Sequence, residues 1–145
     1  MRLTGLMLVV GLVAIISSAA LGADMMAAAK TELGTASTHA GFAAQYDAVA
    51  EVELHLHHVV NCLEGPAGKN YNMGAGNVCQ GQGNGIFADL KDSGMAGAHA
   101  LPYAEIADQV ANWGLQQTMS KDLGRAKAAA AAAKAVIQLA MDNFK

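Results

Sequence analysis

An alanine-rich segment near the C-terminus constrains the fold of this chain most strongly. The run AKAAAAAAK covers residues 126–134, and alanine has the highest helix propensity of all residues. Outside the short stretch of residues 51–57, the chain shows no regular alternation of apolar and polar residues of the kind that is typical of half-buried strands. The sequence therefore predicts an all-α protein.

Capping residues divide the chain into four predicted helices. Gly34 is a natural helix C-cap, and Ser37 or Thr38 can N-cap the next helix. Pro102 suits a first helical turn, and Ser120 can cap the last helix. The predicted helices cover, in order, residues 24–33, 38–63, 102–118 and 120–144. We expect a small helical bundle with three main helices plus a short N-terminal helix.

Helical spacing also predicts which side chains form the core. In the second predicted helix one face is entirely apolar, and in the third the large apolar residues follow a spacing of four and then three positions. The predicted core faces are Val49, Val52, Leu56, Val59, Val60 and Leu63 in the second helix, and Ile106, Val110 and Trp113 in the third.

The first 23 residues resemble a secretory signal peptide. Arg2 precedes an apolar run from Leu6 to Ile16, and small residues follow around Gly22. The apolar run is short for a bilayer span, so we expect no stable membrane span after cleavage. The remaining chain, residues 24–145, has about 122 residues, the size of a single helical domain. This predicts a periplasmic or secreted protein.

A glycine-rich segment, residues 65–98, separates the second and third predicted helices. Cys79 lies within this loop and Cys62 lies just before it, and they are the only cysteines. An exported chain meets an oxidising environment, so we expect a Cys62–Cys79 disulfide that closes half of the loop. A loop of this length gives a stabilisation of roughly 3 kcal/mol in the chain-entropy account. The spacing supports neither a CxxC zinc knuckle nor a CxxCH haem attachment site.

Four of the five histidines fall within the second predicted helix or at its start. On a helical wheel, Glu51, His55 and His58 share one polar stripe with Cys62, at spacings of three and four residues. Two imidazoles and a carboxylate are suitable ligands for Zn²⁺ or Cu²⁺. His99, just before the third predicted helix, can add a ligand from a second element. The opposite flank of the same wheel carries His39, Tyr46, Glu53 and His57.

Two other interpretations of these histidines remain open. HxHH is not an established metal signature such as HExxH, so the stripe can equally be a solvated helix face with pairwise contacts. A bundle of this kind can also hold a b-type haem between two histidines, or between a histidine and a methionine.

Charge and composition argue against two classes of function. Without Arg2 the chain keeps eight basic and twelve acidic residues, a net charge of −4, which argues against nucleic acid as a partner. No nucleophile motif such as GxSxG is present, so we do not expect an enzyme.

The small exported chain, with its alanine-rich helices and clustered histidines, resembles the small periplasmic helical metal-binding proteins of bacteria. That resemblance implies non-catalytic storage, buffering or delivery of copper or zinc. The alternative from the residues is an interaction module whose stapled loop docks on a periplasmic protein.

Overall fold

The chain folds into an antiparallel helical bundle with a long first helix. The structure, a computed structural model, describes the backbone of residues 6–144 and the side-chain environments of residues 22–144. The helices are α1 (Leu6–Gln45), α2 (Val49–Glu64), α3 (Ile86–Asp92), α4 (Gly94–Met119) and α5 (Leu123–Asp142), with a short 3₁₀ helix, η1 (Met73–Ala75). No strand occurs between residues 6 and 144, so the all-α prediction is confirmed.

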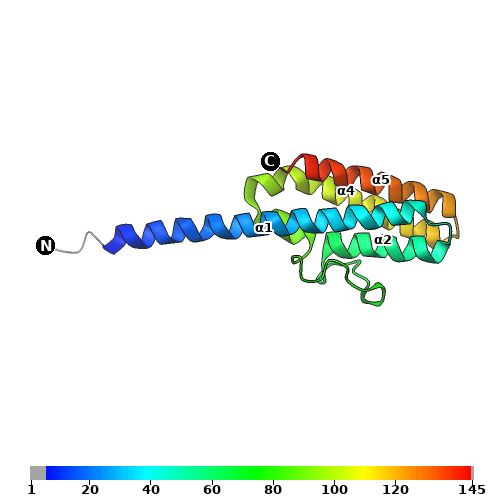
Figure 1. Ribbon diagram of the computed structural model, residues 1–145, viewed down its shortest axis with the longest axis horizontal. Helices are drawn as coiled ribbons and strands as arrows, with labels where there is room; N and C mark the ends of the chain where they lie inside the picture. Colours follow the sequence, from blue (N-terminus) through cyan, green and yellow to red (C-terminus); the bar gives the residue numbers. More distant parts are fainter. Residues whose placement is uncertain (1–5, 145) are drawn as a thin grey trace.

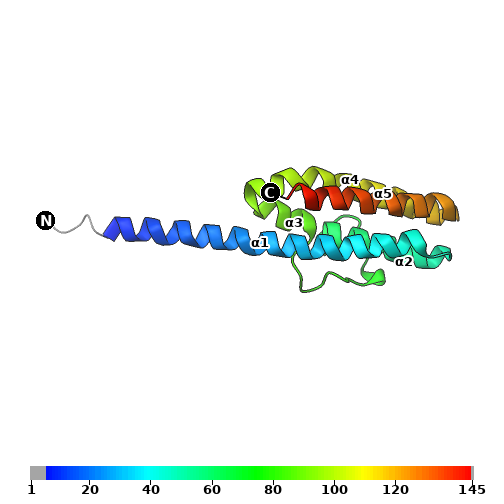
Figure 2. The same ribbon diagram turned by 45° about the horizontal axis from the view of Figure 1, so that its top comes forward.

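Helix α1 runs along the bundle and extends well beyond it at its N-terminal end (Figure 1). Its C-terminal half packs on α2 and α5, while α4 packs on α5 and α2. Figure 2 shows the same arrangement from a second direction, with α4 and α5 together on one side of α1. Residues 1–5 of the predicted signal peptide lie outside the described residues, and residues 6–23 belong to α1. No helix in the described part of the chain combines the length and apolarity needed to cross a membrane.

The first predicted helix boundary is wrong, because α1 continues through Gly34. The Thr38 hydroxyl donates to the Gly34 carbonyl at 2.9 Å, within the helix, and does not cap a new one. A mid-helix glycine costs roughly 1 kcal/mol, and the packing of Leu33 and Ala36 on both sides of Gly34 in the core offsets this cost. The chain turns instead at residues 46–48 and starts α2 at Val49.

The predicted loop is also too long, because α3 and the start of α4 lie within residues 65–98. Ile86 and Leu90 are fully buried and fasten α3 to the core. Pro102 is therefore inside α4 and not in its first turn. Gly97 explains the early start of α4, because a Cβ there would overlap the backbone carbonyl of Leu90. Only glycine lets α4 approach α3 so closely at this point.

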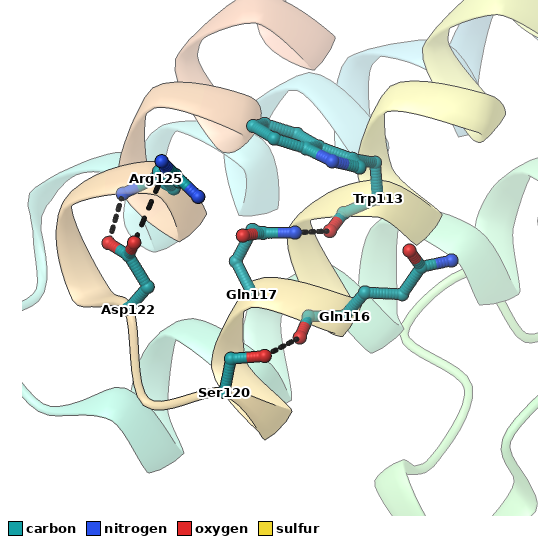
Figure 3. A network of polar contacts seen from close by, with 6 residues as sticks. All are labelled: Trp113, Gln116, Gln117, Ser120, Asp122 and Arg125. Atoms are coloured by element: carbon teal, nitrogen blue, oxygen red, sulfur yellow. Dashed lines mark hydrogen bonds and ion pairs between the residues drawn. The ribbon is translucent and has the colours of Figure 1, made fainter.

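The connection between α4 and α5 corrects one further boundary (Figure 3). Ser120 ends α4, and its hydroxyl donates to the Gln116 carbonyl at 3.2 Å. Asp122 is the N-cap of α5 and accepts a hydrogen bond from the Arg125 backbone N–H at 3.0 Å. An aspartate carboxylate at the N-cap also interacts favourably with the positive end of the helix dipole.

Small residues form much of the core. On α2 the predicted core face is confirmed except at its first residue, because five of its six residues are fully buried and Val49 is half-buried. On α4 the prediction is wrong, because Ile106 and Trp113 are 47% and 44% exposed. The buried face of α4 consists instead of Gly97, Ala100, Ala104, Ala107, Ala111, Gly114 and Thr118. Small side chains on facing helices permit the close approach that these bulky residues would block.

Candidate metal centre

Three histidines from two helices meet beside the turn between α1 and α2. His39 lies near the end of α1, and His55 and His58 lie on α2. The Nδ1 atom of His39 is 2.9 Å from Nδ1 of His55 and 3.1 Å from Nδ1 of His58. Among the described residues, these three form the one group of three or more histidine, cysteine or acidic side chains whose potential ligand atoms all lie within 4.8 Å of one another.

The spacing of these nitrogens suits a tetrahedral metal ion. Zinc binds histidine nitrogen at about 2.0–2.1 Å, which places two nitrogens of a tetrahedral site about 3.3–3.4 Å apart. The two short contacts of His39 are slightly below this separation. A small rotation of the imidazole rings would bring both nitrogens to the distance that a shared ion requires.

One hydrogen bond accounts for only one of the two short contacts of His39. A neutral imidazole nitrogen has either one N–H or one lone pair in the ring plane. Nδ1 of His39 therefore makes one good hydrogen bond, although it lies within about 3 Å of two other nitrogens. A cation bound by all three lone pairs turns both contacts into favourable ones.

The surroundings of the cluster favour neutral imidazole rings, which are the form that binds metal. Burial, together with the neighbouring His58 and His55, lowers the pKa of His39 to about 4. Burial also lowers the pKa of His55, and so does His58. The Tyr46 ring stacks on His55 with its centroid 5.2 Å away and an interplanar angle of 10°.

The glycine-rich loop fixes the orientation of His58. Nε2 of His58 donates to the backbone carbonyl of Ala75 at 2.8 Å. Carbonyl oxygen only accepts hydrogen bonds, so Nε2 carries the proton, and in neutral His58 the lone pair lies on Nδ1. Metal-binding histidines typically show such a bond from the second nitrogen to a carbonyl or carboxylate. His58 is 92% buried beneath this loop, being 8% exposed.

The predicted ligands are only partly brought together. His55 and His58 are in the cluster, while the exposed Glu51 is outside it and interacts with His55 only through its charge, which opposes the lowering of the His55 pKa. His99 is exposed on α4 and does not belong to the cluster. His57 faces the loop, with Nε2 3.2 Å from Nδ2 of Asn72.

Sequence reasoning placed His39 on the wrong flank of one long helix. The turn at residues 46–48 separates His39 from α2 and folds α1 back along it, so wheel angles do not carry across the turn. Asp47 marks the turn, and its carboxylate binds Nζ of Lys127 on α5 at 2.6 Å. This ion pair joins two residues that are far apart in the sequence, so a helical wheel of one segment cannot predict it.

The predicted disulfide is confirmed and closes the loop that covers the cluster. Cys62 and Cys79 are joined across a Cα–Cα distance of 5.4 Å, and both residues are buried in the core. Comparison of the chain with protein-family models, curated proteins and solved structures gives no match.

Proposed function

We propose that this protein binds a transition metal ion, zinc or copper, through Nδ1 of His39, His55 and His58. The observation that carries the proposal is the pair of short contacts made by one nitrogen of His39, at 2.9 and 3.1 Å. Three neutral imidazoles suit both Zn²⁺ and Cu²⁺. Water or an incoming molecule completes the coordination shell.

The proposed role is non-catalytic storage, buffering or delivery of the ion in an exported protein. A resident ion with three protein ligands keeps one position open, and an open position lets the ion pass to another ligand set. The signal-like N-terminus is the basis for the exported location. An interaction module that binds no metal is the alternative role, and a haem carrier would instead show a Soret absorption band.

The test is zinc and copper titration of the purified chain against a competing chelator, with native mass spectrometry for stoichiometry. We expect one ion per chain. His39→Ala should weaken binding by more than about 100-fold, since the loss of outer-shell partners alone costs 10–100-fold. His99→Ala is the matched control, because His99 is exposed and lies outside the cluster.

Two results would contradict the proposal. Wild-type protein that takes up neither metal would make the cluster a packed set of neutral rings and favour the interaction module. Equal affinity in wild type and His39→Ala would show that the ion binds elsewhere. The same titration of Glu51→Gln separates our site from the one predicted from the stripe on α2 alone, because Glu51 is exposed and outside the cluster.

A further inference from the structure

A short turn of the glycine-rich loop presents the Ala75 carbonyl to His58. The turn contains η1 and is held by Asn72, whose Oδ1 accepts hydrogen bonds from the backbone N–H groups of Gly74 at 2.9 Å and Ala75 at 3.3 Å. Gly76 ends the turn with a φ of +82°, a value that favours glycine. The turn is exposed at its tip, where Met73 is 83% accessible.

A buried asparagine of α2 fastens this turn to the helix. Asn61 is 1% exposed and lies one turn beyond His58. Its Nδ2 donates to the carbonyls of Asn72 at 2.8 Å and Gly76 at 2.7 Å, and its Oδ1 accepts from the Asn72 N–H at 2.7 Å. Three short bonds from one buried side chain fix both ends of the segment that carries Ala75.

We infer that Asn61 and Asn72 are positioning residues for the metal centre, and that metal binding and order in the 72–76 turn are coupled. The inference rests on the proposed function. The Ala75 carbonyl selects the tautomer of His58 whose Nδ1 lone pair faces His39 and His55. A turn that moved away would leave His58 free to present either nitrogen and to change its ring orientation.

The coupling works in both directions. A cation on Nδ1 draws electron density from the ring and makes Nε2–H a stronger donor to Ala75, because hydrogen bonds from charged groups are stronger than neutral ones. By linkage, the free energy that the ordered turn adds to metal binding equals the free energy by which the bound metal stabilises the turn. The exposed turn then differs in order between the metal-bound and metal-free protein.

The experiment compares four forms of the full chain. Asn72→Ala removes the side-chain acceptor that holds the turn. The substitution is made at a partly exposed position. Asn72→Asp keeps an acceptor for Gly74 and Ala75 and replaces the amide nitrogen that faces His57 by a carboxylate oxygen. Asn77→Ala is the matched control, because Asn77 makes the same kind of turn bond, to Cys79 N–H at 3.0 Å, elsewhere in the loop. Circular dichroism melts verify that each variant is folded.

The expected results concern affinity and the His58 ring. Zinc should bind Asn72→Ala 10–100-fold more weakly than wild type, the usual effect of losing an outer-shell partner. Asn72→Asp should bind at wild-type affinity or better, and Asn77→Ala at wild-type affinity. In metal-free wild type, ¹⁵N shifts should show the proton of His58 on Nε2, and this preference should be lost in Asn72→Ala. Zinc should slow amide exchange at Gly74, Ala75 and Gly76.

The outcomes separate the inference from the proposed function. Wild-type zinc affinity in Asn72→Ala, with an unchanged His58 tautomer, would overturn the inference and leave the metal centre in place. Weakened binding in both Asn72 variants would assign the effect to His57 and overturn the role of the turn. Wild-type protein that binds neither zinc nor copper would overturn the proposed function, and the coupling with it.

Discussion

Replacing Glu32 by glutamine should stabilise the protein at neutral pH and remove one pH dependence. Glu32 on α1 is 1% exposed and lies beside Asp89 on α3, which is fully buried. The backbone N–H of Gly85 donates to Glu32 Oε1 at 3.0 Å, and the Asn84 N–H donates to Asp89. Glu32 Oε2 has no hydrogen-bond donor among the described residues. When Glu32 is protonated, the O–H on Oε2 can donate a hydrogen bond to the Asp89 carboxylate, so this oxygen is no longer left without a partner.

The magnitude follows from the protonation of Glu32. Burial raises its pKa, and the charge of Asp89 adds to this, from 4.5 to about 8. Folded protein therefore keeps a proton that unfolded protein releases above pH 4.5. The favourable contribution is complete below pH 4.5 and is lost as the pH rises toward 8. At pH 7 the cost is on the order of 3 kcal/mol, from 1.36 kcal/mol per pKa unit.

Urea unfolding of wild type and Glu32→Gln at several pH values measures this cost. Glutamine is neutral, can accept from Gly85 and can donate to Asp89. The variant should therefore differ from wild type by less than about 1 kcal/mol at pH 5 and be more stable by about 3 kcal/mol at pH 7. Glu105→Gln, at an exposed position of α4, is the control. A constant difference between the two proteins from pH 5 to 8 would refute a proton held by this pair.

Three further predictions test the packing of the helices and the loop. Gly34→Ala should raise the free energy of unfolding by about 1 kcal/mol in a denaturant titration, because Gly34 lies inside α1 with no atom near the added Cβ; destabilisation would restore the predicted helix end there. Gly97→Ala should destabilise by at least about 1–3 kcal/mol, since its Cβ would overlap the Leu90 carbonyl, and an unchanged thermal melt would disprove this close approach. Exchange of Cys62 and Cys79 for serine should cost about 3 kcal/mol in urea unfolding, and a loss below about 1 kcal/mol would show that the loop is held by its polar anchors alone.

The local part of the histidine cluster was predictable, and the tertiary part was not. His55 and His58 are three residues apart on one helix, so the sequence alone indicates that their side chains are neighbours. His39 joins them only because α1 turns back at residues 46–48. No glycine or proline marks that turn, whereas Gly34 resembles a helix end and is not one. Capping signals are weak where tertiary packing supplies more free energy than they do.

The buried face of a helix was predicted well where its side chains are large and poorly where they are small. Branched residues on one face of α2 identified its buried side. On α4, the large apolar residues Ile106 and Trp113 gave a wrong prediction of the buried face. The helix lies so close to α5 and α2 that only small side chains fit between them. An added Cβ at Gly114 would lie 2.9 Å from Cβ of Ala129 and 3.0 Å from Cδ1 of Leu56. At such spacing the buried face of a helix is marked by its smallest residues.

The glycine-rich loop has few apolar side chains, so polar anchors hold it instead. Asn61 fixes residues 72 and 76 at one end, and the Glu32–Asp89 pair binds the backbone of residues 84 and 85 at the other. Glycine at position 83 is required at this second anchor, because a Cβ there would overlap the Asp89 carboxylate. Under the proposed function each anchor responds to a different solution variable: the first to the proposed ion on His58, and the second to the proton of Glu32. Raising the pH toward 8 places a second negative charge beside Asp89, and this repulsion should loosen residues 83–85 while zinc still protects residues 74–76. Amide exchange along this one loop would resolve the two effects.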